Sequence, residues 1–257
     1  MLTRRRFLTL AGFAALLGAG YPVVEARMVR VTRVDIDMGL GVKAVHITDT
    51  HFSTSVFSSE EVVATVEELR PGIIFHTGDL LTFRRGLEEA REFISALSEI
   101  APVYLVPGNH DHWSGVGGKG LKKELGSGAR VLLNEAVRIG DVIIAGVDDP
   151  YTGRADLGRA LRGAGDAEVK LLLAHSPQII GEAAQQVELV LAGHTHGGQV
   201  RLPRKGALWL PLPREYWRFD YGLFSVGGTR LFVSRGVGTG YLPVRLNCPP
   251  EIVALSL

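Results

Sequence analysis

The chain has 257 residues, of which 46% are hydrophobic and 21% are charged, and its formal net charge is +1. This balance is typical of a globular protein with a sizeable core. It argues against the basic surface needed to bind phosphate backbones, so no specific nucleic-acid binding is expected. The single cysteine, Cys248, excludes an intrachain disulfide framework and a cysteine-rich metal site.

Residues 1–26 are organised like an export signal, with arginines first and an apolar stretch after them. The segment "TRRRFL" resembles the twin-arginine (Tat) motif, and Val24 and Ala26 would permit cleavage after Ala26. The alternative is an uncleaved membrane anchor, although glycines and Pro22 interrupt the run and it is short for a span. We therefore expect a Tat-type signal peptide or anchor at 1–26 and a folded domain at 27–257. The Tat export machinery would be a partner, and the protein would be extracytoplasmic, in the cell envelope or associated with a membrane or cell wall.

The first half of the folded region alternates between strand-like and helix-like segments. The expected elements are strands at 29–38 and 42–51, a helix at 59–70, a strand at 72–79, a helix at 86–100, and a strand and loop at 102–113. Ser58 or Ser59 would cap the first helix, and Pro71 and Gly72 would end it. This alternation indicates βαβ units and a largely parallel sheet.

The second half contains more strand than helix. The expected elements are a hairpin at 131–149 that turns at Gly140 and Asp141, strands at 169–177 and 187–196 with a helix at 176–186 between them, and β structure at 223–257 with a turn at Gly227 and Gly228. A chain that begins with βαβ units and ends in hairpins suggests two mixed sheets packed together with helices outside. Because no linker divides it, one domain is expected.

Several of these strands end in side chains that can bind metals. In chain order they are Asp49 and His51, Asp79, Asn109 with His110 and Asp111, His175, and His194 with His196. The first three of these groups are spaced by about 30 residues, the length of one βαβ unit. Because ligands bind beyond the carboxyl ends of parallel strands, these side chains should meet in one crevice.

Oxygen and imidazole ligands without thiolates favour manganese, iron or zinc. The candidate ligands are too many for one ion, whereas two divalent ions about 3.5–4 Å apart that share a carboxylate would use them all. Such a pair lowers the pKa of a bridging water and stabilises phosphoryl oxygens during in-line displacement. The sequence contains neither a GxxxxGK[ST] phosphate-binding loop nor a GxSxG nucleophile motif.

The ordered blocks "DTH" at 49–51, "GD" at 78–79, "GNHD" at 108–111, "AHSP" around His175 and "GHTH" at 193–196 resemble those of calcineurin-like metallophosphoesterases. The resemblance covers nearly all of the chain after residue 40. The segments "GHTHGGQVRLP" and "SRGVGTGYLPVRLNCPPEI" resemble its small, often exported bacterial branch. The resemblance implies an α/β fold, a four-layer α/β/β/α sandwich of two mixed sheets.

The resemblance also implies roles for the strand-end residues. Asp49, His51 and His196 would hold the first metal, Asp79 would bridge both ions, and Asn109, His175 and His194 would complete the second site. His110 would be the general acid that protonates the leaving oxygen, with Asp111 orienting it. The expected nucleophile is the bridging hydroxide.

Other polar residues have less specific interpretations. His46 and His76 lie inside strands and are expected to be structural. His112 could line the pocket or support it from outside, and Asp148 and Asp149 could form a turn before Pro150 or orient a ligand. Residues 199–221 carry aromatic residues and cations, which could form a substrate rim, touch a membrane, or cover the core as a proline-tied loop.

The leading prediction is a metal-dependent phosphoric ester hydrolase that acts on phosphomonoesters or phosphodiesters, with a cell-envelope or lipid-linked phosphate as substrate. One alternative is a pyrophosphate hydrolase on a nucleotide-linked lipid such as UDP-2,3-diacylglucosamine, although an export signal speaks against a cytosolic substrate. An alternative of another class is a non-catalytic metal-binding scaffold. Such a scaffold should have lost ligands or His110, and none is missing from this chain.

Overall fold

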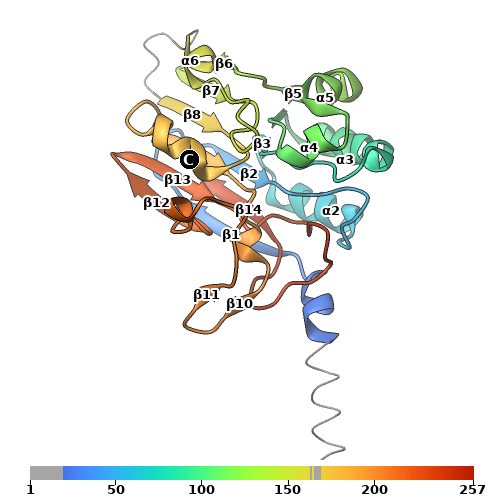
Figure 1. The fold of residues 1–257 in the computed structure, drawn as a ribbon. Coiled ribbons are helices and arrows are strands. Elements are labelled where there is room, and N and C mark those ends of the chain that lie inside the picture. The colour runs from blue at the N-terminus through green and yellow to red at the C-terminus, as the bar shows by residue number, and fades with distance from the viewer. Residues whose placement is uncertain (1–19, 163, 165–168) are drawn as a thin grey trace, which may run out of the picture.

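The computed structural model describes residues 20–162, 164 and 169–257. The twin-arginine segment, with Arg4 and Arg5, lies outside the described residues. Two six-stranded sheets and a small hairpin make up the β structure (Figure 1). Among the described residues, no helix has both the length and the apolar character needed to cross a membrane.

The first sheet has the strand order β1-β14-β2-β3-β4-β5. Its strands are β1 (Arg30–Asp35), β14 (Glu251–Ser256), β2 (Lys43–Ile47), β3 (Ile73–His76), β4 (Val103–Leu105) and β5 (Arg130–Val131). Strands β2 to β5 run parallel, as the βαβ pattern predicts. The last strand, β14, returns to pair parallel with β1 and antiparallel with β2.

The second sheet has the order β12-β13-β9-β8-β7-β6. Its strands are β12 (Gly222–Val226), β13 (Thr229–Val233), β9 (Leu189–Ala192), β8 (Val169–Leu173), β7 (Val142–Gly146) and β6 (Glu135–Ile139). The hairpins β6–β7 and β12–β13 flank parallel strands, so this sheet is also mixed. The two predicted hairpin turns are confirmed, because Ile139 pairs with Val142 and Val226 pairs with Thr229.

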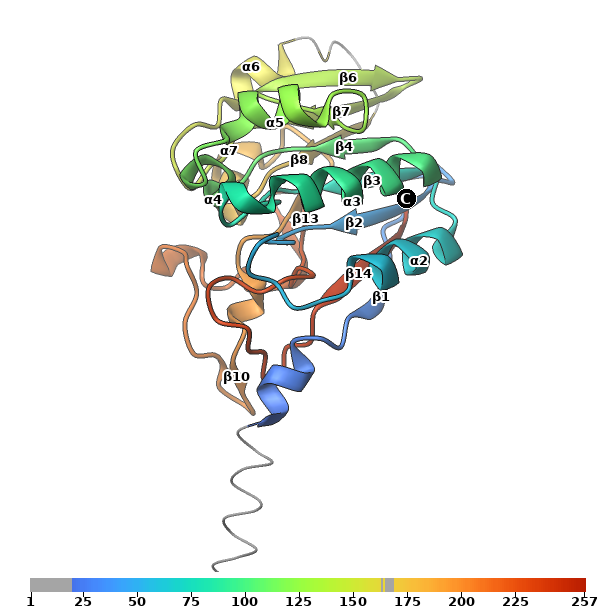
Figure 2. The same ribbon diagram turned by 90° about the vertical axis from the view of Figure 1, so that its right-hand side faces the viewer.

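Helices cover the outer faces of the two sheets (Figures 1 and 2). The helices beside the first sheet are α2 (Ser59–Leu69), α3 (Leu87–Ile100) and α5 (Gly117–Leu125), and those beside the second are α6 (Leu157–Leu161) and α7 (Ile180–Ala183). Ser58 caps α2 by accepting a hydrogen bond from the Glu61 amide, as predicted. The expected helix at 176–186 is shorter than predicted, consisting of a 3₁₀ turn (Pro177–Ile179) followed by α7.

Three apolar clusters separate the layers. Side chains alternate along each strand, so Val45 and Ile47 of β2 face the helices while Ala44 faces the other sheet. The central cluster joins Phe75 of the first sheet to Leu171 of the second and their neighbours. The order helix, sheet, sheet, helix confirms the predicted α/β/β/α sandwich.

The remaining described elements lie beside this sandwich. They are the short helix α4 (Asn109–Trp113), the hairpin of β10 (Arg201–Leu202) and β11 (Gly206–Ala207), the 3₁₀ turns η1 (Arg84–Gly86), η3 (His196–Gly198) and η4 (Arg214–Tyr216), and helical residues 20–25. The hairpin and residues 20–25 project at the same end of the molecule (Figure 2).

Candidate metal centre

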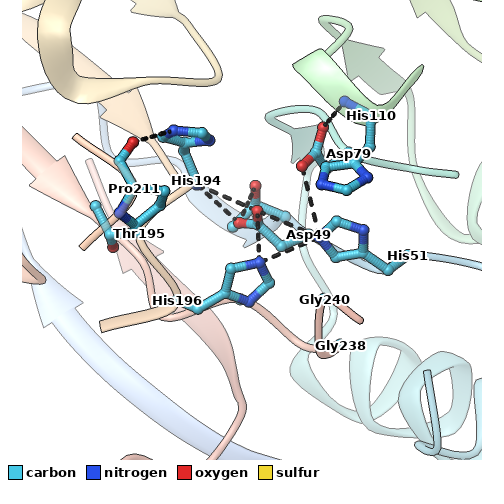
Figure 3. Close-up of polar contacts among 12 residues, drawn as sticks. Asp49, His51, Asp79, His110, His194, Thr195, His196, Pro211, Gly238 and Gly240 are labelled. Atoms are coloured by element: carbon cyan, nitrogen blue, oxygen red, sulfur yellow. Dashed lines mark hydrogen bonds and ion pairs between the residues drawn. The ribbon is translucent and has the colours of Figure 1, made fainter. Parts of the chain in front are cut away.

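The predicted ligands come together where strands of both sheets end (Figure 3). Asp49 and His51 follow β2, Asp79 follows β3, Asn109 begins α4 after β4, His175 follows β8, and His194 and His196 follow β9. Three groups have ligand atoms within 4.8 Å of one another: Asp49, His51 and His196; His51, Asp79 and His110; and Asp79, His175 and His194. The Oδ1 atom of Asn109 lies 3.1 Å from Nε2 of His175.

Asp79 lies between the two predicted metal positions. Its Oδ2 atom is 3.5 Å from Nε2 of His51 and 3.3 Å from Nε2 of His175. Its other oxygen accepts a hydrogen bond from the His110 amide at 2.8 Å. A carboxylate in this position can contact two ions at once, as the bridging assignment requires.

The main chain at these strand ends adopts a left-handed conformation. The φ angles are 55° at Asp49, 50° at His51, 52° at Asp79, 70° at His194 and 51° at His196. Each such residue costs of order 1–3 kcal/mol, and the conformation persists only where surrounding contacts fix it. Here the Asp49 amide donates to the Gly78 carbonyl, and the His51 amide donates to the Asp79 carbonyl. The strain lies at the expected ligands, where side chains must turn out of their strands into the crevice.

Glycines in the motifs allow close approach to the carboxylates. A Cβ atom at Gly193 would collide with Asp49 Oδ2 and the Thr48 side chain. One at Gly108 would collide with the Asp79 carboxylate. The glycines that precede "HTH" and "NHD" are therefore required by the distance between main chain and ligand.

Three imidazoles turn one nitrogen toward the centre and the other toward an oxygen. The outward pairs are His51 Nδ1 with Thr82 Oγ1 at 3.0 Å, His175 Nδ1 with the Thr77 carbonyl at 2.8 Å, and His194 Nε2 with the Pro211 carbonyl at 2.8 Å. Metal-binding histidines usually have such an outer acceptor, which fixes the ring and its tautomer. In the neutral ring, the inward nitrogen is then free to bind a cation.

The electrostatics of the centre also suit cations. Burial lowers the pKa of His51 and His194 to about 3, which keeps both rings neutral. Burial raises the pKa of Asp49 to about 6. For His175, burial is outweighed by the charge of Asp79, and its pKa rises to about 10. Buried carboxylates surrounded by imidazoles need a compensating positive charge, which bound divalent ions supply.

His110 and Asp111 have different surroundings. The His110 ring lies 4.8 Å from the His51 ring and 5.2 Å from the Tyr241 ring, and its Nδ1 has no hydrogen-bond partner among the described residues. The Asp111 carboxylate instead accepts hydrogen bonds from the amides of Leu80, Leu81 and Gly108. Within the described part of the chain, no hydrogen bond joins Asp111 to the His110 ring. Asp111 therefore fixes the two ligand loops, and a direct orienting contact with His110 stays a prediction.

A cavity of about 460 Å³ opens onto the centre and is bordered by Asp79, Asn109, His110, His194 and His196. Its outer wall is largely apolar and consists of Trp113, Tyr151, Trp209, Tyr241 and Leu242, which we call the aromatic rim. Every side chain of the aromatic rim is at least 40% exposed. Exposed apolar side chains gathered at a pocket mouth mark a binding surface.

The other predicted polar residues have structural partners. His46 Nε2 pairs with Thr77, and His76 Nε2 pairs with Thr50, so both strand histidines are structural as expected. His112 does not line the cavity and lies 2.6 Å from Asp148.

The two predicted loops support the cavity. Asp149 accepts from the amides of Tyr151 and Thr152 in a turn, which places Tyr151 at the rim. In segment 199–221, Trp209 joins the rim and the Pro211 carbonyl holds His194. This segment therefore serves the site as well as covering the core.

Sequence reasoning missed the residues that hold the ligands from behind. Thr77 and Thr82 contact the outer nitrogens of His175 and His51. Their position next to the "GD" motif was the one feature of the sequence that could have indicated this role. Arg245, which contacts His196, lies in no metal-binding motif and is wholly buried. Arg245 lies within the segment "SRGVGTGYLPVRLNCPPEI", whose resemblance to the small bacterial branch assigned no role to any single residue.

Comparisons with known proteins agree with this geometry. Residues 42–198 match the family described as calcineurin-like phosphoesterase, and this span includes every predicted ligand. The chain is 32% identical to the phosphodiesterase YaeI of Escherichia coli, with 100% of both chains covered. It is 30% identical to the metallophosphoesterase YkuE of Bacillus subtilis, with 100% of this chain and 98% of the relative covered. The solved structure of TT1561 from Thermus thermophilus shares the fold, with a TM-score of 0.50 and 14% identity over 76% of this chain and 90% of that one.

Proposed function

Because the chain belongs to the calcineurin-like phosphoesterase family, we propose that it hydrolyses phosphate esters with two divalent metal ions bound at the paired strand ends. The observation that carries this proposal is the sharing of Asp79 between two groups of candidate ligands, one with His51 and His110 and one with His175 and His194. Two ligand groups on one carboxylate suit a dimetal site better than a mononuclear one.

The donor set fits this cofactor. Asp49, His51 and His196 would hold the first ion, Asn109, His175 and His194 the second, and Asp79 both. When bound, the ions supply an activated water for attack on phosphorus and neutralise charge on the phosphoryl oxygens. Nitrogen and oxygen donors without thiolate support manganese, iron or zinc as the metals.

Side chains of the pocket would donate the proton to the leaving group and bind the organic part of the substrate. The imidazole of His110 borders the cavity and would donate a proton to the leaving oxygen. The bond from its amide to Asp79 holds the His110 main chain at a fixed distance from the ligands. The aromatic rim would bind the organic part of the ester and exclude bulk water from the reacting group.

A lipid-linked phosphate of the cell envelope is the proposed substrate class. The support is the apolar rim, whose Trp209, Tyr241 and Leu242 are each more than 60% exposed. Apolar rings that are exposed beside the reactive groups suit an acyl or prenyl chain better than a sugar or a nucleic acid. The name of the Escherichia coli relative supports a phosphodiester over a monoester.

The rim also suits the lipid part of UDP-2,3-diacylglucosamine, so pyrophosphate hydrolysis remains the second candidate. The signal-like residues 1–26 support export by the Tat machinery within the small bacterial branch of the family. The hydrogen bonds of the Glu25 carboxylate with the amides of Asn247 and Cys248 favour a retained membrane anchor over cleavage after Ala26. The signal-like residues favour the envelope substrate over the cytosolic nucleotide. A non-catalytic scaffold has less support, because all seven proposed ligands and His110 are present.

Hydrolysis of bis-p-nitrophenyl phosphate and of a phospholipid diester in vesicles, with Mn²⁺ and after chelation, tests the proposal. We expect metal-dependent turnover of both substrates. A short-chain analogue of the phospholipid is assayed beside it, and the long-chain lipid should have the lower KM of these two lipids. Chelation should abolish both activities, and added Mn²⁺ should restore them. Turnover that survives chelation would contradict the dimetal mechanism, and equal KM values for the two lipids would contradict the substrate class.

A further inference from the structure

Arg245 is a wholly buried arginine behind the first metal position, outside the family match at residues 42–198. Its Nη1 donates to the His196 carbonyl at 3.2 Å, and its Nη2 lies 3.3 Å from Nδ1 of the His196 ring. The opposite nitrogen of that ring, Nε2, faces His51 and Asp49 at 3.1 and 3.4 Å. Arg245 therefore holds the main chain of this ligand, whereas its contact with Nδ1 does not support the ring, because a guanidinium only donates and a ring that binds a metal through Nε2 keeps its proton on Nδ1.

The same guanidinium holds the loop that supports Asp49. Nη2 donates to the carbonyls of Arg235, Gly236 and Gly238. In that loop, the amides of Val237 and Gly238 donate to the carbonyls of Thr48 and Asp49. A Cβ atom at Gly236 would lie only 2.7 Å from Cβ of Asp49. The loop thus packs directly on the Asp49 main chain and side chain.

Helical residues 20–25 fix Arg245 from the other side. The Arg245 amide donates to the Pro22 carbonyl at 2.8 Å. The buried Glu25 carboxylate accepts from the amides of Asn247 at 3.1 Å and Cys248 at 2.8 Å. Cys248 also donates from Sγ to the His196 carbonyl at 3.2 Å. Glu25 therefore anchors the short segment 245–248, which contacts His196.

We propose that Arg245 is a positioning residue of the first metal site, which holds the His196 main chain and the Asp49 loop in their ligand geometry while Glu25 anchors segment 245–248. Among the described residues, its hydrogen bonds reach no ligand of the second site. Loss of Arg245 should therefore weaken one metal site and spare the other. The inference rests on the proposed assignment of Asp49, His51 and His196 to one ion.

The test is calorimetric titration of the metal-free full chain with Mn²⁺, read together with the electron paramagnetic resonance spectrum. Wild type should bind two ions and give the spectrum of a coupled pair. Arg245→Gln should weaken one site by about 10–100-fold and leave the other unchanged, with the spectrum of an isolated ion. Arg245→Lys should behave like Arg245→Gln, because one ammonium cannot reach both sets of carbonyls.

Two outcomes would overturn the inference: equal weakening of both sites, which a general structural role predicts, or wild-type binding in Arg245→Lys. His196→Ala is the reference for the first site. If His196→Ala still binds two ions with wild-type affinity, the proposed ligand assignment fails. If it loses one ion and the Arg245 variants lose none, only the positioning role fails.

If the Arg245 variants do not fold, Glu25→Ala tests the same segment from the helix. Glu25→Ala removes the acceptor for the Asn247 and Cys248 amides, not a contact of Arg245 itself, and should weaken the same Mn²⁺ site through segment 245–248. Val24→Ala, on an exposed side chain of the same helix, should not. Identical Mn²⁺ binding in Glu25→Ala and Val24→Ala would contradict the role of Glu25 and of the segment that it anchors.

Discussion

The four imidazoles proposed as ligands differ in what supports them from behind. His51, His175 and His194 each have an oxygen behind the ring, whereas His196 has the guanidinium of Arg245. An oxygen acceptor fixes a single ring, whereas the guanidinium holds the His196 main chain and the loop beside Asp49. In the first site, Arg245 is therefore a support shared by His196 and the loop beside Asp49, in addition to the Thr82 contact of His51, whereas the two imidazoles of the second site have separate supports.

His110 and His112 lie on the same short helix and allow a matched comparison of catalytic roles. We expect His110→Ala to keep both metals and lose about 10²–10⁴-fold in turnover, the usual contribution of a general acid. His112→Ala should change turnover little, because His112 pairs with Asp148 away from the cavity. Metal analysis and steady-state kinetics measure both. Metal loss in His110→Ala that matches its loss of turnover would make His110 a ligand instead.

The proposed ligands could be found from sequence because each follows an apolar strand within a short motif. Their supports could not be found in the same way. Pro211 and Arg245 contact His194 and His196 across turns of irregular chain, and no periodic pattern specifies such contacts. The left-handed conformation of Asp49 and His194 was also hidden, since neither residue type requires it.

At the scale of elements, β14 joins the two halves of the molecule. It pairs with β1 and β2 of the first sheet. Its first residue, Glu251, accepts hydrogen bonds from Thr32 on β1 and from Arg235, which follows β13 of the second sheet. This ion pair, in which Glu251 is buried and Arg235 is half-buried, therefore connects the two sheets beside the loop that supports Asp49.

Glu251→Gln should destabilise the metal-free protein by about 1–3 kcal/mol at neutral pH, as expected when the half-buried Arg235 loses its charged partner. Although burial opposes the charge, Arg235 holds the pKa of Glu251 below its ordinary value. The stabilisation is therefore complete above the ordinary glutamate range of about 4.3 and is lost as pH falls through the lower folded-state value. Urea unfolding of wild type and variant over this range measures the difference.

The exposed pair of Lys122 and Glu135 supplies the control for this prediction. Glu135→Gln should change the free energy of unfolding by less than about 1 kcal/mol, because water screens the pair. A stability loss in Glu251→Gln no larger than in Glu135→Gln would contradict the role of β14 as a tie between the sheets. So would a difference between wild type and Glu251→Gln that grows as the pH falls.

Elements with a local signal were predictable, and those that depend on distant pairing were not. The turn at Gly140 and Asp141 and the α2 cap at Ser58 were specified by nearby residues. The expected loop after β4 instead forms the helix α4, in which the Asp111 carboxylate accepts from the Gly108 amide. The return of β14 between β1 and β2 had no local signal, because its partners lie more than 200 residues away.

At the scale of the whole molecule, each proposed metal site takes ligands from both sheets. Asp49 and His51 follow a strand of the first sheet, and His196 follows a strand of the second. The second site likewise combines Asp79 and Asn109 with His175 and His194. The site therefore exists only when the two sheets pack. The strand pattern predicted two mixed sheets packed together with helices outside, and the family resemblance then implied the specific four-layer α/β/β/α sandwich.

Anomalous diffraction from crystals of the full chain grown with Mn²⁺ tests the central claim most directly. The account predicts two manganese peaks about 3.5–4 Å apart with the Asp79 carboxylate between them. One peak should lie among Asp49, His51 and His196, and the other among Asn109, His175 and His194. A single peak at saturating Mn²⁺, or two peaks that do not share Asp79, would contradict it.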